Sequence, residues 1–343
     1  MRGFFAGFFS VLGGLPLLYG LLLLLLVNEE HLPPPPFSGR WDVDRKLQDL
    51  RAGRPERIDL LLIGSSTTFY GVDGGVLRAQ LGGRIAVFHA SSPGLKIHQS
   101  EFLTRFYVEH FPEIDSAIMV STPLDFENCP RESAAIFDSA QVRRYLAAAD
   151  SEIFWHFKYF DPAGVFETML QRPVQAAMPL TRLGLRLLDP YGGQQLDPPP
   201  ENVPQSIFRG VFPEPDPRCY QALSRLARFL HERGIRFLFA QAPLRPGYLA
   251  RYDPDGRRLA AHLARVRQLL AREGAHFLNL HEQLALPEAA FFDAYHIRAP
   301  YVPLQTRSLA EALQRLSSPP MPEIAGSRAH PRPPSRSDVA SRT

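Results

Sequence analysis

The chain has 343 residues, of which 45% are hydrophobic, 21% charged and 11% aromatic, and its formal net charge is +3. This is the composition of a globular protein, and it excludes a collagen-like, coiled-coil or wholly disordered chain. The small positive charge is spread over dispersed arginines, so nucleic acid is not an expected partner.

The start of the chain predicts a membrane segment. Residues 4–27 are almost entirely apolar, long enough to cross a hydrocarbon core of roughly 30 Å as a helix. The stretch is longer than the apolar region of a cleaved signal peptide, and it runs directly into Glu29 and Glu30. We therefore predict an uncleaved transmembrane signal anchor over residues 1–30.

Charge around the span predicts its orientation. Arg2 precedes the span, so the positive-inside rule places the N-terminus in the cytoplasm. The rest of the chain is then expected on the extracytoplasmic, periplasmic side of the inner membrane. Residues 31–56 are predicted to be a juxtamembrane linker, in which the run from Pro33 to Pro36 fits a stiff polyproline spacer and a simple helix stop equally well.

The only cysteines are Cys129 and Cys219, too few for a four-cysteine zinc or iron–sulfur site. No other spacing indicates metal ligation, so we expect neither a metal nor a cofactor. On the extracytoplasmic side the two thiols could pair. The sequence leaves this pairing open, because it specifies no distance between them.

Residues 57–316 predict an α/β domain. Five short runs rich in branched or aromatic residues are typical of buried strands: Ile58 to Ile63, Ile85 to Phe88, Ala117 to Val120, Ile235 to Ala240 and His276 to Leu280. Five amphipathic segments predict helices: Gly75 to Leu81, Lys96 to His110, Pro217 to Arg233, Gly256 to Glu273 and Pro303 to Leu316. The alternation indicates a doubly wound, flavodoxin-like parallel sheet of five strands with helices on both faces.

The alternation is interrupted over residues 126–216. This stretch contains an aromatic-rich run, Ile153 to Phe160, and a helical pattern near 166–183. A structureless loop of that length is uncommon in a compact domain, so we predict an inserted subdomain or lid that contacts substrate or a partner. The final residues, 317–343, are rich in Pro, Ser and Arg without periodicity and are predicted to be disordered.

Two motifs follow predicted strands. Gly64-Ser65-Ser66 follows the first strand, and in parallel sheets ligands bind beyond the carboxyl ends of the strands. A segment starting near residues 71–73 is expected to turn backbone N–H groups toward an oxyanion. Asp293 precedes His296 by three residues, a spacing at which the carboxylate can accept the imidazole Nδ1–H and leave Nε2 free to take a proton from a serine.

The order of three short pieces resembles the SGNH/GDSL hydrolase superfamily. They are Gly64-Ser65-Ser66, the turn Ala90-Ser91-Ser92-Pro93-Gly94, and Asp293-x-x-His296, and the resemblance covers residues 58–316 apart from the insertion. It implies that Ser66 is the nucleophile of a Ser-His-Asp triad with His296 and Asp293. It also implies that the N–H groups of Gly94 and Ser66 form the oxyanion hole.

The third block of this family, Gly-x-Asn-Asp, falls on residues 122–125, where Leu124 occupies the place of the asparagine donor. Thr122, Asn128 or a residue of the insertion could supply a donor instead. His89 is interpreted as a buried histidine at a strand end. We interpret Tyr70, Lys96, His98 and Arg105 as ordinary packing or solvated helix charges.

The Gly-Ser-Ser variant on a tethered domain is similar to the branch that includes DltD and the alginate O-acetylation proteins. That similarity implies acyl transfer to or from a cell-envelope polymer, sometimes beside a multi-span membrane O-acyltransferase. We therefore expect a membrane-anchored serine esterase or O-acyltransferase. The alternatives are a catalytically weak scaffold or glycan-binding component of a polysaccharide modification or export complex, and a free-standing lipase.

Overall fold

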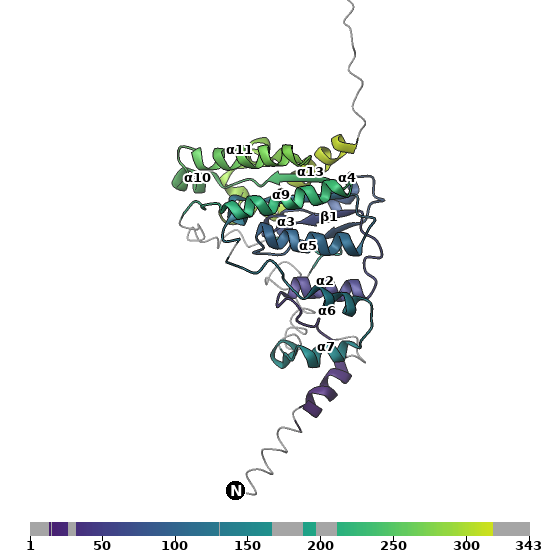
Figure 1. Cartoon of the computed structure of the whole chain (residues 1–343). Helices are drawn as coiled ribbons and strands as arrows, with labels where there is room; N and C mark the ends of the chain where they lie inside the picture. The colour runs from purple at the N-terminus through teal and green to yellow at the C-terminus, as the bar shows by residue number, and fades with distance from the viewer. Residues whose placement is uncertain are drawn as a thin grey trace, which may run out of the picture.

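The computed structural model describes residues 14, 16–26, 32–129, 131–166, 188–196 and 211–317 (Figure 1). Much of the predicted anchor, most of the 166–183 pattern and all of the tail after Ser317 lie outside these ranges. Among the helices that are described, none has both the length and the apolar character needed to cross a bilayer.

The prediction of an α/β domain with five parallel strands is confirmed. The strands are β1 (Leu60–Ile63), β2 (Val87–His89), β3 (Ser116–Ser121), β4 (Arg236–Gln241) and β5 (His276–Asn279). Their order in the sheet is β2-β1-β3-β4-β5, and every pairing is parallel. The order reverses between β1 and β3, and in such sheets a ligand-binding crevice forms at this point.

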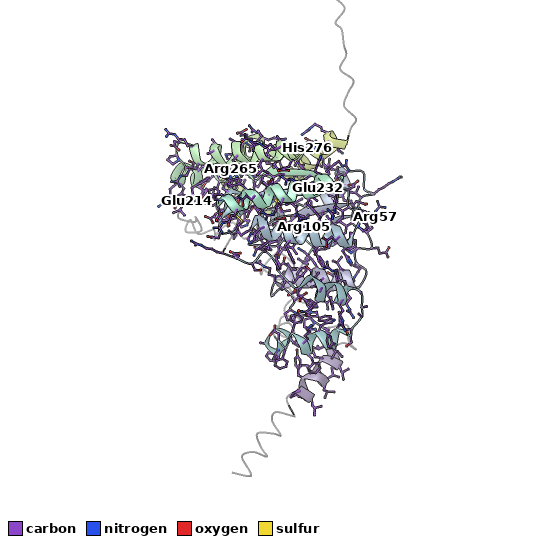
Figure 2. The ribbon with its side chains drawn as sticks, viewed as in Figure 1. Arg57, Arg105, Glu214, Glu232, Arg265 and His276 are labelled. Carbon is purple, nitrogen blue, oxygen red and sulfur yellow. A yellow bond between two sulfur atoms is a disulfide. The ribbon has the colours of Figure 1, made fainter. Side chains whose placement is uncertain are left out.

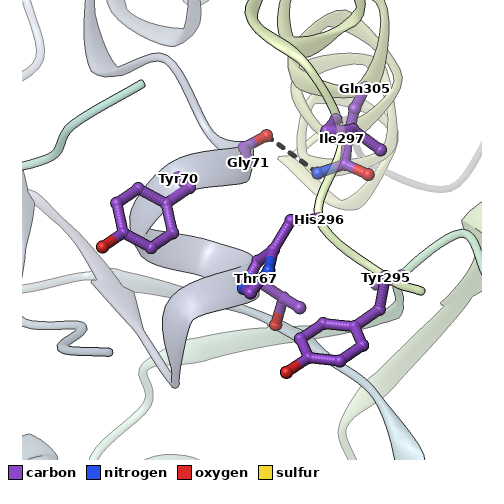
Figure 3. Close-up of a pocket in the computed structure, with 8 residues that line it drawn as sticks. Thr67, Tyr70, Gly71, Tyr295, His296, Ile297 and Gln305 are labelled. Carbon is purple, nitrogen blue, oxygen red and sulfur yellow. Dashed lines mark hydrogen bonds between the residues drawn. The ribbon is translucent and has the colours of Figure 1, made fainter. Parts of the chain in front are cut away.

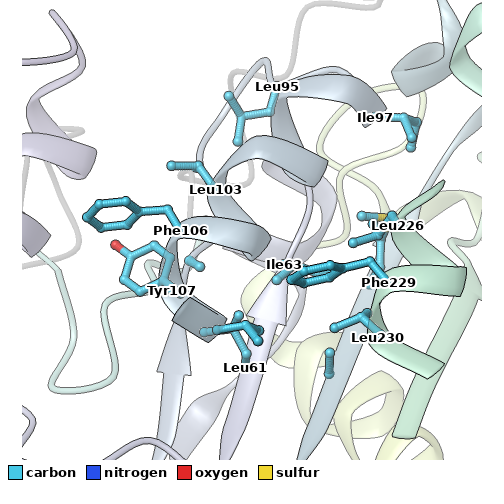
Figure 4. Packing of buried hydrophobic residues seen from close by; sticks show 14 of the residues in the cluster. Leu61, Ile63, Leu95, Ile97, Leu103, Phe106, Tyr107, Leu226, Phe229 and Leu230 are labelled. Carbon is cyan, nitrogen blue, oxygen red and sulfur yellow. The ribbon is translucent and has the colours of Figure 1, made fainter. Parts of the chain in front are cut away.

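Both faces of the sheet are covered, because successive side chains of a strand point to opposite sides. Leu61 and Ile63 of β1 belong to one hydrophobic cluster, and Leu60 and Leu62 belong to the other. Figure 4 shows the first cluster, in which β1 packs against helices α5 (Ile97–His110) and α9 (Pro217–Glu232). The second cluster contains residues of α4 (Gly74–Gln80) and α13 (Val302–Ser317).

The helices predicted from periodicity are present within one or two residues of their expected ends, including α11 (Arg257–Arg272). Further helices were not predicted: α2 (Trp41–Arg51), α3 (Ser66–Gly71), α6 (Ser139–Leu146), α7 (Glu152–Lys158), α10 (Pro246–Tyr252) and α12 (Leu280–Leu284), with the 3-10 turns η1 (Pro123–Phe126), η3 (Glu288–Ala290) and η4 (Ala299–Tyr301). Most of these elements are too short to display a full amphipathic period.

The segment 31–56, predicted as a juxtamembrane linker, is in large part folded onto the domain. Helix α2 buries Val43, Leu47 and Leu50, which share one face of the helix. Phe37, just after the proline run, packs against aromatic residues of the insertion: Tyr145, Trp155 and Tyr159. The prolines therefore lead into a packed surface and do not form a free spacer.

The insertion begins and ends at one place. The N–H of Asp216 donates to the carbonyl of Phe126 over 2.7 Å. Beside this contact Cys129 and Cys219 form a disulfide with 5.4 Å between their Cα atoms, which answers the question that the sequence left open. Between these ends, α6 and α7 pack beneath α2, and residues 188–196 run past the edge strand β2, where the N–H of His89 donates to the carbonyl of Tyr191 over 2.8 Å.

Candidate active site

Ser66 lies directly beyond the carboxyl end of β1, as the first residue of helix α3. Gly64 makes this sharp turn possible, because its φ is 122° and a Cβ there would lie 2.7 Å from the Thr68 hydroxyl. That hydroxyl donates to the carbonyls of Ile63 and Val120 and so holds α3 against β3. The helix thus begins at Ser66 itself, earlier than the 71–73 start that the sequence suggested. The N–H groups of Thr68 and Phe69 donate to the carbonyl of Ser65, the N-cap, at 3.2 and 3.0 Å, and those of Ser66 and Thr67 have no partner within the helix.

His296 and Asp293 lie on a tight turn between η3 and η4. The carboxylate Oδ1 of Asp293 accepts the N–H groups of Tyr295 and His296 at 3.0 and 2.8 Å. The N–H of Phe292 donates to the carbonyl of His296 over 2.8 Å, closing the turn. The side chains of Asp293 and His296 are therefore held in one orientation by the backbone.

The structure brings Ser66, His296 and Asp293 together. The Nε2 atom of His296 is 2.7 Å from Oγ of Ser66, and its Nδ1 atom is 2.6 Å from Oδ2 of Asp293. These residues are separated by up to 230 positions in the chain, yet they form one line of hydrogen bonds. The arrangement can pass a proton from the serine hydroxyl to the imidazole while the carboxylate stabilises the resulting charge.

Asp293 remains ionised in this setting. Burial acts to raise the pKa of its carboxyl group, but the hydrogen bond and charge of His296 and the two backbone N–H groups outweigh it, so the pKa lies below the ordinary aspartate value. A carboxylate, and not a carboxylic acid, therefore faces Nδ1. This favours the tautomer with the proton on Nδ1 and a free lone pair on Nε2.

Two tyrosines flank the imidazole, and neither was assigned to the site from sequence. The ring of Tyr70 lies 5.6 Å from that of His296 in an edge-on arrangement, and the ring of Tyr295 lies 4.4 Å away. With Thr67 and Gln305 they line a small cavity of about 10 Å³ (Figure 3). Tyr70 follows Ser66 by four residues, one helical turn, which is the sequence signal that could have placed it here.

Residues 90–94, the second of the three motif pieces, form a turn beside the start of α3. The N–H of Ser92 donates to the carbonyl of Gly64 over 3.1 Å, and Gly94 has a φ of 78°. Two cations of helix α2 and its N-cap hold this turn. Arg40 donates to the carbonyl of Pro93, and the buried Lys46 donates to the carbonyl of Ser91. Gly94 thus lies near the turn at Gly64 that precedes Ser66, although no hydrogen bond joins Gly94 to Ser66 among the described residues.

His89 is a buried histidine at the end of β2, as interpreted from sequence. Its Nδ1 atom lies 3.1 Å from the Ser91 hydroxyl. Burial and the nearby charge of Lys46 lower the pKa of His89 to about 3, so its ring is neutral and part of the support under the turn at residues 90–94.

Leu124, which the resemblance aligns with the asparagine donor of the SGNH/GDSL superfamily, lies in the 3-10 turn η1. Leu124 is buried in η1, and its carbonyl accepts a hydrogen bond from Lys96 Nζ over 2.9 Å. Asp125 accepts the Ser121 hydroxyl over 2.7 Å. Burial raises the pKa of Asp125, while hydrogen bonds from Ser121 and Ser65 oppose this rise. Lys96, two residues after Gly94, thus links the turn at residues 90–94 to η1 and is not merely a solvated helix charge.

Thr122 and Asn128, suggested from the sequence as donors in place of the asparagine, differ in how far they are buried. Thr122 is buried, and its backbone N–H donates to Asp125 Oδ2 over 3.1 Å. Asn128 is exposed on the turn that follows η1, with a φ of 56°. Neither side chain is hydrogen-bonded to Ser66 or His296 within the described residues.

Compared with known proteins, the chain matches no family model and no curated protein. The geometry of the site therefore carries the functional argument.

Proposed function

We propose that this protein is a membrane-anchored serine esterase or O-acyltransferase of the SGNH/GDSL type, acting on a cell-envelope polysaccharide through an acyl-serine intermediate. The observation that carries the proposal is the line of hydrogen bonds from Ser66 through His296 to Asp293 at the carboxyl edge of a parallel sheet. A nucleophile, a base and a group that orients the base are the minimum for covalent acyl transfer.

The reaction has two balanced halves. Nε2 of His296 takes the proton of Ser66 as Oγ attacks an ester carbonyl, and the tetrahedral intermediate collapses when His296 returns that proton to the departing alcohol. Water or a sugar hydroxyl then attacks the acyl-serine, giving its proton to His296, which passes it back to Ser66. Water makes the protein an esterase, and a sugar hydroxyl makes it a transferase.

The oxyanion is held by the N–H of Ser66, at the first turn of α3, and by that of Gly94. The absence of the block-three asparagine removes one donor, which is worth about 2.7 to 4 kcal/mol of transition-state stabilisation in a comparable oxyanion hole. Transfer is therefore expected to be slow unless another donor, such as Tyr70, reaches the oxyanion. Burial raises the pKa of Tyr70, with a smaller contribution from Asp42, so its hydroxyl stays protonated and can donate.

The proposed setting is the periplasmic face of the inner membrane. The apolar stretch 4–27 would anchor the chain there, and the Cys129–Cys219 disulfide is compatible with an oxidising compartment. Like DltD and the alginate O-acetylation proteins, which it resembles in its Gly-Ser-Ser motif, the protein would work beside a multi-span membrane O-acyltransferase. A tether raises the effective concentration of enzyme near such a donor.

A second candidate function is favoured by one observation, the buried Leu124 in place of the asparagine. A catalytically weak scaffold or glycan-binding component of the same modification or export complex would tolerate this replacement. It would not need a reactive serine.

Covalent labelling tests the proposal. After treatment of the full chain with a fluorophosphonate, intact-mass measurement is expected to find one adduct per chain, and peptide mapping is expected to place it on Ser66. Ser65→Ala is the matched control and should still be labelled, because the Ser65 hydroxyl lies 3.2 Å from Thr67 Oγ1 and also contacts Asp125, away from the imidazole. A chain that takes up no adduct but binds glycan would favour the scaffold function.

Gly94→Ala is expected to lower kcat by about 10²-fold with little change in KM, because a displaced N–H weakens the oxyanion hole. The left-handed backbone conformation also costs roughly 1–2 kcal/mol of stability once a Cβ is present. Gly83→Ala is the matched control: its φ is 77°, and no atom lies within 4 Å of the added Cβ. Turnover of a chromogenic ester and thermal unfolding separate the two effects, and equal kcat values for both variants would remove Gly94 from the site.

A further inference from the structure

The large hydrophobic side chains that are exposed gather in one region. Of the eleven such residues in the described part of the chain, nine lie either on the N-terminal helix, described over residues 16–26, or on the segment 152–166, which contains α7. The exposed members are Leu17, Leu18, Leu21, Leu24 and Leu25 on the helix, and Phe154, Phe157, Phe160 and Phe166 on the segment. Soluble surfaces rarely collect apolar residues in this way, and such patches mark membrane or protein contacts.

The two groups form one continuous surface, because the segments pack together. The ring of Tyr19 lies 5.6 Å from that of Phe157 and 5.0 Å from that of Phe160. Val165 is buried in a cluster with Tyr19 and Leu23. Figure 1 shows α7 between the N-terminal helix and the body of the domain, with α2 and α6 on its other side.

Three polar side chains of the segment are hydrogen-bonded within the protein. Glu152 accepts the hydroxyl of Tyr145, and the ring of His156 contacts the Pro33 carbonyl at 3.0 Å. Asp161 accepts the N–H of Gly164. The exposed cation Lys158, which lies over the Trp155 ring, is suited to lipid phosphates. The surface therefore presents rings and a cation, beside the half-buried Asp161, which lies near Tyr19.

We propose that the segment 152–166 is a membrane-contacting surface that lies in the outer interface of the bilayer beside the anchor. Tyr19 precedes Leu26 by seven residues, so along a helix at 1.5 Å per residue it lies about 10 Å deeper. Interfacial helices bury their apolar faces about 5–10 Å into the boundary between headgroups and acyl chains. The phenylalanines that touch Tyr19 are thus placed at the depth that such a surface requires. This proposal rests on the membrane anchor of the proposed function.

A second point of membrane contact would orient the domain. A single anchor permits rotation, whereas an anchor and an adjacent interfacial segment restrict the height and tilt of the sheet above the lipid. In Figure 2, Arg57, before the start of β1, lies at the right and Glu214, before α9, at the left, so the strands run across the view. A restricted height and tilt would hold the carboxyl edge with Ser66 at a fixed height above the lipid.

Fluorescence quenching by lipid tests this proposal on the full chain. Phe160→Cys offers a single free thiol, because the two native cysteines are joined to each other. The thiol is labelled with an environment-sensitive dye, and the chain is reconstituted into phosphatidylcholine and phosphatidylglycerol vesicles that carry a spin-labelled lipid. We expect the dye at residue 160 to shift its emission to the blue and to be quenched nearly as strongly as a dye at Leu21→Cys in the N-terminal helix.

Two control positions distinguish failure of the membrane anchor from failure of the interfacial segment. Arg257→Cys on α11, whose side chain is 86% exposed, should remain unquenched because it is remote from the surface. If Leu21→Cys is also unquenched, the membrane anchor of the proposed function is wrong. If Leu21→Cys is quenched and Phe160→Cys behaves like Arg257→Cys, the anchor stands and the interfacial segment is overturned. That second result is also the one expected if the phenylalanines cover a partner membrane protein, because these vesicles contain none.

Discussion

Ser66→Ala is expected to reduce hydrolysis of a chromogenic ester by at least about 10³-fold, since removal of a triad member leaves only the oxyanion hole and binding to act on the substrate. The lost hydroxyl is the one that lies 2.7 Å from His296 Nε2. The same variant should lose its fluorophosphonate adduct. In cells, the acyl content of the surface polymer should fall to the level of a strain that lacks the protein.

The fold of this variant is expected to survive. The Ser66 side chain bonds to the imidazole, whereas α3 is held to β3 by the hydroxyls of Thr67 and Thr68. Unfolding temperature therefore serves as the control. If ester hydrolysis and polymer acylation both persist unchanged in a folded Ser66→Ala protein, the enzymatic function is ruled out, and the scaffold function takes its place.

Asp293→Asn is expected to lower kcat by about 10⁴-fold, the effect of the equivalent change in a serine protease triad. The amide Oδ1 can still accept the N–H groups of Tyr295 and His296, so the turn is retained. Its NH₂ group, however, faces Nδ1, which must then act as an acceptor. The ring proton moves to Nε2, and His296 can no longer take the proton of Ser66.

Asp189→Asn is the matched control for this substitution. Asp189 Oδ1 also accepts two backbone N–H groups, those of Tyr191 and Gly193, at 2.8 and 2.9 Å. It has no histidine hydrogen-bonded to its carboxylate within the described residues. Steady-state kinetics should therefore be unchanged for Asp189→Asn. Equal activity of the two variants would show that Asp293 only shapes its turn.

The sequence by itself determined the elements with strong local patterns. Strands such as 58–63 are short apolar runs, and helices such as 217–233 repeat apolar residues at three and four positions, so each could be located without knowledge of its neighbours. The motifs Gly64-Ser65-Ser66 and Asp293-x-x-His296 could be found for the same reason. Each motif is a pattern of residues only a few positions apart, and a parallel sheet places strand ends on one edge.

Only the tertiary structure decided which distant groups meet. The contact of Ser66 with His296 spans 230 positions, and the pairing of Cys129 with Cys219 spans 90. The packing of Tyr70 on His296 and of Phe37 on the insertion likewise joins segments whose local patterns carry no information about each other. Local periodicity reports which face of an element is buried, but the identity of the partner depends on how the whole chain closes around its sheet.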